Sequence, residues 1–348
     1  MGKGFGRIQQ RRQRLEERKD KLRDLDEIIP WEVFRPSLER LSSKARKSKA
    51  GRHPIDRMRL FKLLLLQQLY NLSDEDLEYQ CHDRLSFRRF AGLSPEEEVP
   101  DATTISRFRD QLTEEGLIDE LFEQFEELLR KSGYAAKGGQ IIDATLVPVP
   151  IQRNSREENE KIKQGEIPTD WAENPHRLAQ KDREARWTQK NGISYFGYKN
   201  HINIDVGYGF IRSYSVTDAS VHDSRALGAV LDEDNSGKGV WADSAYRSEN
   251  IEAGLEALGH ISHIHERGYR NHPLSEGQIA SHREKSKTRA KVEHVFGAWV
   301  TSMGGKMLRC IGIERVRTQL GLKNLAYNFK RYIFWQKKTQ TSLQIQCA

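Results

Sequence analysis

Three acidic residues stand out because of the residues that surround them. Asp143 lies within QIIDATLVPVP, the most apolar strand-like run of the chain. Ionising a carboxylate in such surroundings costs several kcal/mol unless a cation compensates the charge. Asp243 ends the short run GVWAD, and Glu293 lies on a helix expected at residues 286–303. Each acid alone could be a capping or salt-bridged residue, so the combination of the three carries the interpretation.

The positions of Asp243 and Glu293 are compatible with one shared site. Ligands bind at the carboxyl ends of strands in open α/β sheets, which favours a functional role for Asp243. Glu293 is offset by about 100° from Val292 on the helical wheel, so it borders the buried side of its helix. The apolar residues that define this side recur with helical spacing: Val292, Val295, Phe296, Trp299, Val300 and Met303.

Three carboxylates are ligands for hard cations such as Mg²⁺ and not for zinc. Two such ions about 3.5–4 Å apart can activate a water or a 3′-hydroxyl and stabilise the leaving oxygen of a phosphoryl transfer. We therefore expect Asp143, Asp243 and Glu293 to be catalytic ligands of two Mg²⁺ ions, with Mn²⁺ as a substitute. The histidines between residues 260 and 282 have neither cysteines nor zinc-finger spacing, and we interpret them as part of a polar loop.

The charge of the chain is distributed unevenly. The net charge is +7, but residues 1–52 carry 16 Lys and Arg against 8 Asp and Glu, and residues 284–348 carry 13 against 3. The segment between them is therefore acidic. Two basic ends indicate a polyanionic partner, although blocks of charge also arise on ordinary solvated surfaces.

Composition excludes several classes of protein. The longest apolar stretch, residues 60–69, is interrupted by Lys62, Gln67 and Gln68, so it indicates a core helix and not a membrane span. The basic start of the sequence has no apolar segment typical of a signal peptide. Three widely spaced cysteines (Cys81, Cys310 and Cys347) are typical of a reducing cytosol. We expect a cytoplasmic protein without a membrane partner.

The order of expected elements divides the chain into four parts. Residues 1–29 form a basic charged helix, whose seam of Leu15, Leu22, Leu25 and Ile29 suits docking or dimerisation. Residues 30–134 are expected to form a helical N-terminal domain that serves DNA binding or multimerisation. Residues 304–348 are expected to form a basic helical region. Residues 138–303 show three strands, a helix, a strand, a helix, a strand and a helix, with a charged insertion or loop at 152–190. This order predicts an α/β fold with a ribonuclease H-like catalytic core.

Several motifs resemble the DDE transposases of the insertion-sequence-five family. They are DATLVP, ARWTQKNGISYFGYKNH, VTDASVHDS, ADSAYRS and RAKVEHVFG, and the block ending in PDATTISRFRDQL is similar to that family's N-terminal domain. The resemblance covers roughly residues 30–335. It implies a ribonuclease H-like core, Mg²⁺ dependence, binding of terminal inverted repeats and a multimeric synaptic complex. Asp143, Asp243 and Glu293 match the family's catalytic acids, whereas GKMLRCIG departs from its aromatic-rich pattern.

Further residues are candidates for DNA contacts. Lys199 and His201 have the same strand parity and share a face beside the first aspartate strand. Others flank Glu293 or begin the basic tail: Arg289, Lys291, His294, Lys306 and Arg309. Ordinary surface roles are the alternative for all of these, as they are for Arg88, Arg89, Arg107 and Arg109. We expect His222 and Asp223 to cap a helix.

The expected function is that of an insertion-sequence transposase, which cleaves the element's ends and joins the 3′-hydroxyls to target DNA. Its partners would be double-stranded DNA (terminal inverted repeats and target) and further copies of itself. It would act in a bacterial or archaeal cytoplasm, at the nucleoid when bound to DNA. Two alternatives are a stand-alone metal-dependent nuclease on the same fold and a non-catalytic DNA-binding remnant.

Overall fold

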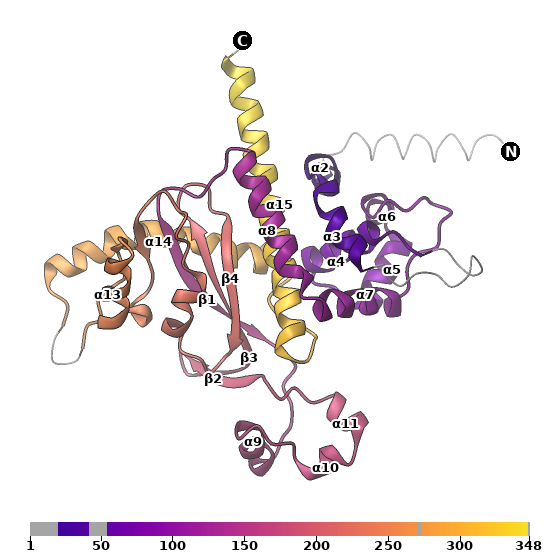
Figure 1. Cartoon of the computed structure of the whole chain (residues 1–348), viewed down its shortest axis with the longest axis horizontal. Helices are drawn as coiled ribbons and strands as arrows, with labels where there is room; N and C mark the ends of the chain where they lie inside the picture. Colours follow the sequence, from indigo (N-terminus) through magenta and orange to yellow (C-terminus); the bar gives the residue numbers. More distant parts are fainter. Residues whose placement is uncertain (1–19, 42–53, 270–272, 347–348) are drawn as a thin grey trace.

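The computed structural model describes residues 20–41, 54–269 and 273–346. A central sheet lies beside a group of N-terminal helices, and one long helix runs between the two (Figure 1). Leu15 lies outside the described residues, so the expected helical seam is described only from Leu22 onward. Within these ranges, no helix combines the length and the apolar character needed to cross a bilayer.

The sheet has six strands in a mixed arrangement. Its strands are β1 (Gln140–Pro148), β2 (Arg186–Lys190), β3 (Ile193–Asp205), β4 (Ile211–Asp218), β5 (Gly239–Trp241) and β6 (Ile261–Ser262). The order is β2-β3-β1-β5-β6, and β4 also pairs with β3. β3 is antiparallel to β1, β2 and β4, whereas β5 is parallel to β1 and β6 is parallel to β5. The central position of β1 explains its continuous apolar sequence, because both of its faces are covered.

The inserted segment between β1 and β3 is folded. It contains α9 (Arg156–Lys163), α10 (Thr169–Ala172) and α11 (Pro175–Ala179), which project away from the sheet (Figure 1). Trp171 is fully buried among them, and its Nε1 donates to Glu158 Oε1 at 2.7 Å. Trp171 is therefore a buried packing centre of a segment whose sequence consists mainly of charged residues. The strand β2 that follows was not expected.

Short helices and one long helix complete this part of the chain. They are η2 (Asp223–Ala226), α12 (Leu227–Val230), η3 (Ser244–Tyr246), α13 (Glu249–Ala257) and α14 (Glu276–Ser302). α14 begins ten residues before the expected start, because Ser275 and Gln278 form a capping box. The expected core position of Val300 is wrong, since this side chain is 57% exposed. On the helical wheel Val300 lies about 80° from Val292, close to Glu293 and outside the buried stripe.

The N-terminal helices and the last helix share one hydrophobic core with the sheet. The elements are α2 (Lys21–Ile28), η1 (Trp31–Phe34), α3 (Arg35–Arg40), α4 (Arg57–Tyr70), α5 (Asp74–Asp83), α6 (Leu85–Phe90), α7 (Ala102–Glu114), α8 (Leu117–Lys131) and α15 (Ile313–Gln346). α15 packs against α4, α7 and α8 and also against β4. Its Phe329 is fully buried and contacts Trp31 and Phe125 edge to face, at centroid distances of 5.6 and 4.7 Å.

Two of the arginines considered for DNA contacts are structural. Arg109 lies 2.6 Å from the Asp74 carboxylate, and its side chain is only 11% exposed. Arg88 is buried and donates to the carbonyl oxygens of Ser94, Pro95 and Glu97. Neither side chain is available to a DNA backbone in this arrangement.

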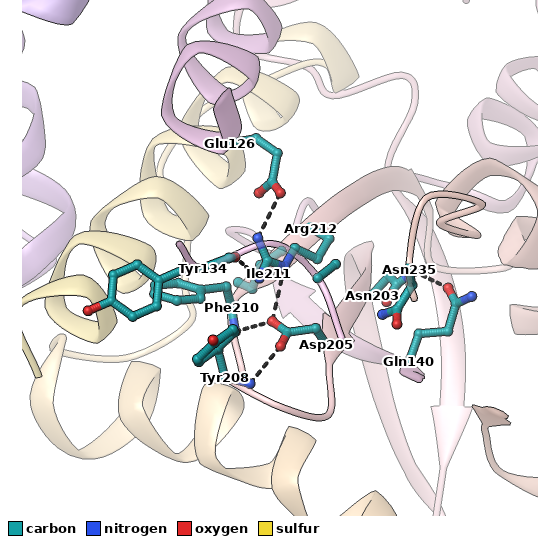
Figure 2. Close-up of polar contacts among 12 residues, drawn as sticks. Glu126, Tyr134, Gln140, Asn203, Asp205, Tyr208, Phe210, Ile211, Arg212 and Asn235 are labelled. Atoms are coloured by element: carbon teal, nitrogen blue, oxygen red, sulfur yellow. Dashed lines mark hydrogen bonds and ion pairs between the residues drawn. The ribbon is translucent and has the colours of Figure 1, made fainter. Parts of the chain in front are cut away.

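A buried polar network joins the helical part to the sheet (Figure 2). Arg212 on β4 donates from Nε to Asp205 Oδ1 at 3.0 Å, from Nη1 to Glu126 Oε1 at 2.7 Å and from Nη2 to the Tyr134 carbonyl at 2.7 Å. Asp205 also accepts the backbone N–H groups of Tyr208 and Phe210. One arginine thus connects α8, the segment before β1, and two strands.

Candidate active site

The register between β1 and β5 brings two of the three acids to the same level of the sheet. Gln140 pairs with Val240 and Ile141 with Trp241, in parallel. Continued by two residues, this register would set Asp143 opposite Asp243, on strands that ordinarily lie about 4.8 Å apart. Since β5 ends at Trp241, Asp243 has left the strand and caps η3, where it accepts the N–H of Ala245 at 2.8 Å.

Asp143 is a deeply placed carboxylate with one cationic partner. Its Oδ1 accepts the N–H of Ala144 at 2.8 Å, and its Oδ2 lies 3.2 Å from Nη1 of Arg289. Burial raises the pKa of Asp143 to about 6; Arg289 opposes this shift, and the charges of Asp243 and Glu293 reinforce it. Both acids therefore lie near enough to Asp143 for their charges to act on its pKa.

Helix α14 carries Glu293 into this region. Arg289 lies one turn before Glu293 on α14, and its ion pair with Asp143 holds that part of the helix against β1. Val292 is fully buried, whereas Glu293 is exposed. Glu293 thus lies at the solvent border of the helix's buried stripe, as the helical spacing predicts.

The three carboxylates have the chemistry of a divalent-cation site but not a completed ligand arrangement. In the described ranges 20–41, 54–269 and 273–346, no group of three or more His, Cys, Asp or Glu side chains is arranged to hold a metal ion. Asp143 is instead paired with Arg289, and Asp243 accepts a backbone N–H. The donor atoms are hard oxygens, and the negative charge that raises the pKa of Asp143 is what a cation would neutralise.

A cavity of about 220 Å³ lies next to Asp243, where β1 continues beyond the end of β5. Its walls come from the open edge of β1, from β2 and β3, and from the aspartates that begin η2 and cap η3. The lining residues are Ala144, Thr145, Leu146, Thr188, Gln189, Lys190, Lys199, Asp223 and Asp243. Cationic and anionic side chains thus line the same space.

The two strand residues expected to contact DNA have different surroundings. Lys199 lines the cavity and forms an ion pair with Asp223 at 2.8 Å. His201 is fully buried, its Nε2 lies 2.9 Å from Thr217 Oγ1, and burial lowers its pKa to about 4. A phosphate contact by His201 is therefore not supported, because the ring is covered and neutral at physiological pH.

Lys199 and His201 share a face of β3, but Asp143 projects from the other face. Directly opposed residues of antiparallel strands project to the same side, and Asp143 is opposite Ile202 while Ala144 is opposite His201. Lys199 therefore approaches the acids only around the open edge of β1. The predicted strand parity of Lys199 and His201 is thus confirmed, and the structure adds the face from which Asp143 projects.

The other candidate cations are spread over a wider surface. Lys306 Nζ donates to Thr145 Oγ1 at 2.7 Å, two residues from Asp143. Lys291 and Arg309 are exposed and donate to the carbonyl oxygens of Val206 and Asn71. His294 is exposed on α14. Arg289 and Lys306 are thus the two cations that lie at the acids.

The structure also adds residues that the sequence did not single out for this site. His222 caps η2 as expected, but Asp223 pairs with Lys199 and lines the cavity. Tyr246 is fully buried; within the described part of the chain its hydroxyl has no hydrogen-bond partner. Burial raises the pKa of Tyr246, and Asp223, Asp143 and Asp243 raise it further. Only the ADSAYRS motif, which contains Tyr246, could have signalled this position.

Comparison with known proteins finds two matching families. Residues 134–329 match the family described as transposase DDE domain, and residues 9–111 match the family described as transposase domain (DUF772). Among solved structures, the chain is similar to a piggyBac transposase in a cryo-EM structure of its synaptic complex with hairpin DNA. That similarity has a TM-score of 0.47 and 12% identity, and it covers 93% of this chain and 74% of that one.

The protein is an enzyme of DNA transposition. More specifically, the chain belongs to the transposase DDE domain family, whose model spans more than half of its residues, and it is a DDE transposase.

Proposed function

We propose that this transposase cleaves the ends of an insertion sequence and joins the 3′-hydroxyls to target DNA, using Asp143, Asp243 and Glu293 as ligands of two Mg²⁺ ions. Mn²⁺ would substitute. The observation that carries the proposal is the parallel register of β1 and β5, which aligns two acids that are far apart in the sequence. The dependence of the Asp143 pKa on both other acids supports it.

The closer affiliation that we propose is the insertion-sequence-five family with a ribonuclease H-like core. Three antiparallel strands (β4, β3 and β1) followed by two parallel ones (β5 and β6) support this fold. The helix α14 packs against β1, as expected for the element that brings the third acid.

When bound, the ions would supply an activated water or 3′-hydroxyl and would neutralise charge on the leaving oxygen. The chain's own residues prepare the site. Arg289 holds Oδ2 of Asp143 at 3.2 Å and offsets part of the cost of burying that charge. Lys306 is fixed by Thr145 in the same region and offers a second cation to a phosphate. DNA binding would let both cations exchange their present partners for phosphate oxygens.

Double-stranded DNA, as terminal inverted repeats and target, is the proposed partner. Joining two element ends in one event requires both ends to be held together, and an assembly of identical subunits provides two equivalent sites. We therefore propose a homo-oligomeric synaptic complex, acting on DNA in the cytoplasm.

The test compares the parent protein with Asp143→Asn, Asp243→Asn and Glu293→Gln on labelled element-end DNA in the presence of Mg²⁺. The ends would first be located by footprinting on the DNA that flanks the gene. Each variant should lose strand cleavage, whereas Glu284→Gln, which alters an exposed glutamate on the same helix, should retain it. Cleavage that persists in one of the three variants would remove that residue from the catalytic set.

Two further measurements separate this function from its alternatives. Calorimetric titration with Mg²⁺ in the absence of DNA should show binding to the parent protein and weaker binding to Asp143→Asn. A strand-transfer assay should yield joined products; cutting without joining would favour a stand-alone nuclease.

A further inference from the structure

The hairpin formed by β2 and β3 is an unexplained projection beside the cavity. Its strands pair from Arg186–Gly197 to Lys190–Ile193, and the turn Asn191–Gly192 has positive φ angles of 52° and 77°. Such a turn matches the twist of two strands and makes a tight, well-defined tip. β2 lies at the end of the sheet from which the α9–α11 segment projects (Figure 1).

One strand of this hairpin forms part of the catalytic cavity. Thr188, Gln189 and Lys190 line the same space as Asp243 and Lys199. The hairpin bends at Gly197, whose φ is 152° and whose α-carbon lies so close to β1 that an added Cβ would be 2.3 Å from the Val147 carbonyl oxygen. The base of the hairpin is therefore held against β1 by the backbone itself.

Two lysines from distant segments lie at this wall, since Lys190 lines the cavity and Lys306 donates to the lining residue Thr145. Burial lowers the pKa of Lys306 and the charge of Lys190 lowers it further, whereas the charges of Glu293 and Asp143 raise it. Among the described residues neither lysine has an ion-pair partner, whereas Arg289 and Lys199 nearby are each paired with an aspartate. Lys190 is thus a cation at the cavity wall that an anionic ligand would stabilise.

The outer part of the hairpin also presents apolar surface. Lys190 is opposite Ile193, so their side chains project to the same side, and Ile193 is 58% exposed. On the other side Trp187 packs against Phe196 at a centroid distance of 5.3 Å and remains 46% exposed. A cation next to an exposed aliphatic side chain suits a nucleotide, which offers a phosphate and an apolar sugar and base.

We propose that the tip of the β2–β3 hairpin is a DNA-contact surface, in which Lys190 binds a backbone phosphate of the strand that enters the cavity, beside Lys306, and Ile193 packs on the adjoining nucleotide. This inference rests on the proposed function of the neighbouring acids. It gives the hairpin the task of guiding the strand toward Asp243.

The experiment measures binding of a fluorescent 30-base-pair duplex of arbitrary sequence, without divalent metal, over a range of salt concentrations. Each phosphate contact that is lost lowers the slope of log K against log[salt] by about 1. Lys190→Gln should show this decrease. The matched control is Lys163→Gln, which removes the same charge from an exposed site on α9 of the inserted segment and should keep the parent slope.

The apolar contact is tested separately. Ile193→Thr keeps a β-branched residue at an exposed strand position, so the fold should be unaffected. This variant should retain the parent slope but lower the binding constant extrapolated to 1 M salt, where phosphate contacts contribute little. An unchanged slope in Lys190→Gln, or an equal decrease in Lys163→Gln, would overturn the proposal, as would an Ile193→Thr variant that binds like the parent.

Failure of this inference is distinguishable from failure of the proposed function. The binding assay involves no cleavage, and the acid variants are judged by cleavage alone. A reduced slope in Lys190→Gln together with full cleavage by Asp143→Asn would support the hairpin contact and refute the catalytic role of Asp143. The reverse pair of results would refute the hairpin contact only.

Discussion

Replacing Arg212 by methionine should destabilise the protein strongly, because it leaves buried acceptors without their common donor. The Arg212 side chain is 2% exposed, and its partners Asp205 and Glu126 are 0% and 14% exposed. Breaking a buried ion pair by removing one partner costs about 3–5 kcal/mol. Typical total stabilities are about 5–15 kcal/mol, so urea unfolding followed by tryptophan fluorescence should show a large shift of the midpoint.

The structure also predicts how this loss depends on pH. Asp205 keeps two backbone N–H donors, so the uncompensated charge falls mainly on Glu126. Burial already raises the pKa of Glu126 above its ordinary value of 4.5, against the opposing effect of Arg212. Without Arg212 the pKa rises further, and a raised carboxyl pKa means that stability falls as pH increases above the unfolded-state value. The cost of Arg212→Met should therefore be larger at pH 8 than at pH 5.

Two additional variants make this reasoning refutable. Arg212→Met combined with Glu126→Gln should regain more than about 1 kcal/mol relative to Arg212→Met, because no buried charge remains at position 126. Arg130→Met, at an exposed site on α8, the helix that carries Glu126, should change stability by less than about 0.5 kcal/mol. A loss below about 1 kcal/mol for Arg212→Met, or an equal loss at both pH values, would show that the network is not a major source of stability.

Three further predictions concern single positions. Burial lowers the pKa of Lys323 from its ordinary 10.5 to about 8. Between pH 8 and pH 10.5 the unfolded chain therefore binds more protons than the folded one, so the stability of the parent should increase with pH over this range. Urea titrations should show this increase for the parent protein and not for Lys323→Met. Leu325→Ala, at a fully buried site, should cost about 2–5 kcal/mol, whereas Phe334→Ala, at a site 50% exposed, should cost much less in the same measurement. Gly197→Ala should lower the free energy of unfolding by about 2–4 kcal/mol, because alanine is strained at this φ and its Cβ clashes with Val147. Thermal unfolding would detect this loss, and an unaltered midpoint would contradict the close approach of the strands.

The strongest sequence signals identified the elements that carry the acids. β1 was predictable because an uninterrupted apolar run indicates a strand covered on both faces, and α14 because apolar residues recur at helical spacing before and after Glu293. What hydrophobic periodicity cannot provide is the register of β1 with β5, since β5 has only three residues and pairs at two positions. The alignment of Asp143 with Asp243 therefore needed the structure.

Other features were missed for identifiable reasons. β2 has no apolar alternation, although Asn191–Gly192 between two short runs is a hairpin signal that the sequence does contain. The first three turns of α14 contain one large apolar residue, the exposed Ile279, so only the capping box at Ser275 marks their start. Arg109 was indistinguishable from a surface cation, because its partner Asp74 lies on another helix and only the fold brings them together.

The position of α15 has a consequence for how the protein matures during synthesis. Helices α4, α7 and α8 and strand β4 all emerge from the ribosome before α15, yet each packs against it. Until α15 has emerged, the apolar surfaces of these elements that it covers have no partner, and contacts between residues this far apart in sequence form slowly. A nascent chain would therefore contain Asp143, Asp243 and Glu293 while its core is still open, and we expect the core to close only after α15 has emerged as far as Tyr332, its last buried residue in the described part of the chain.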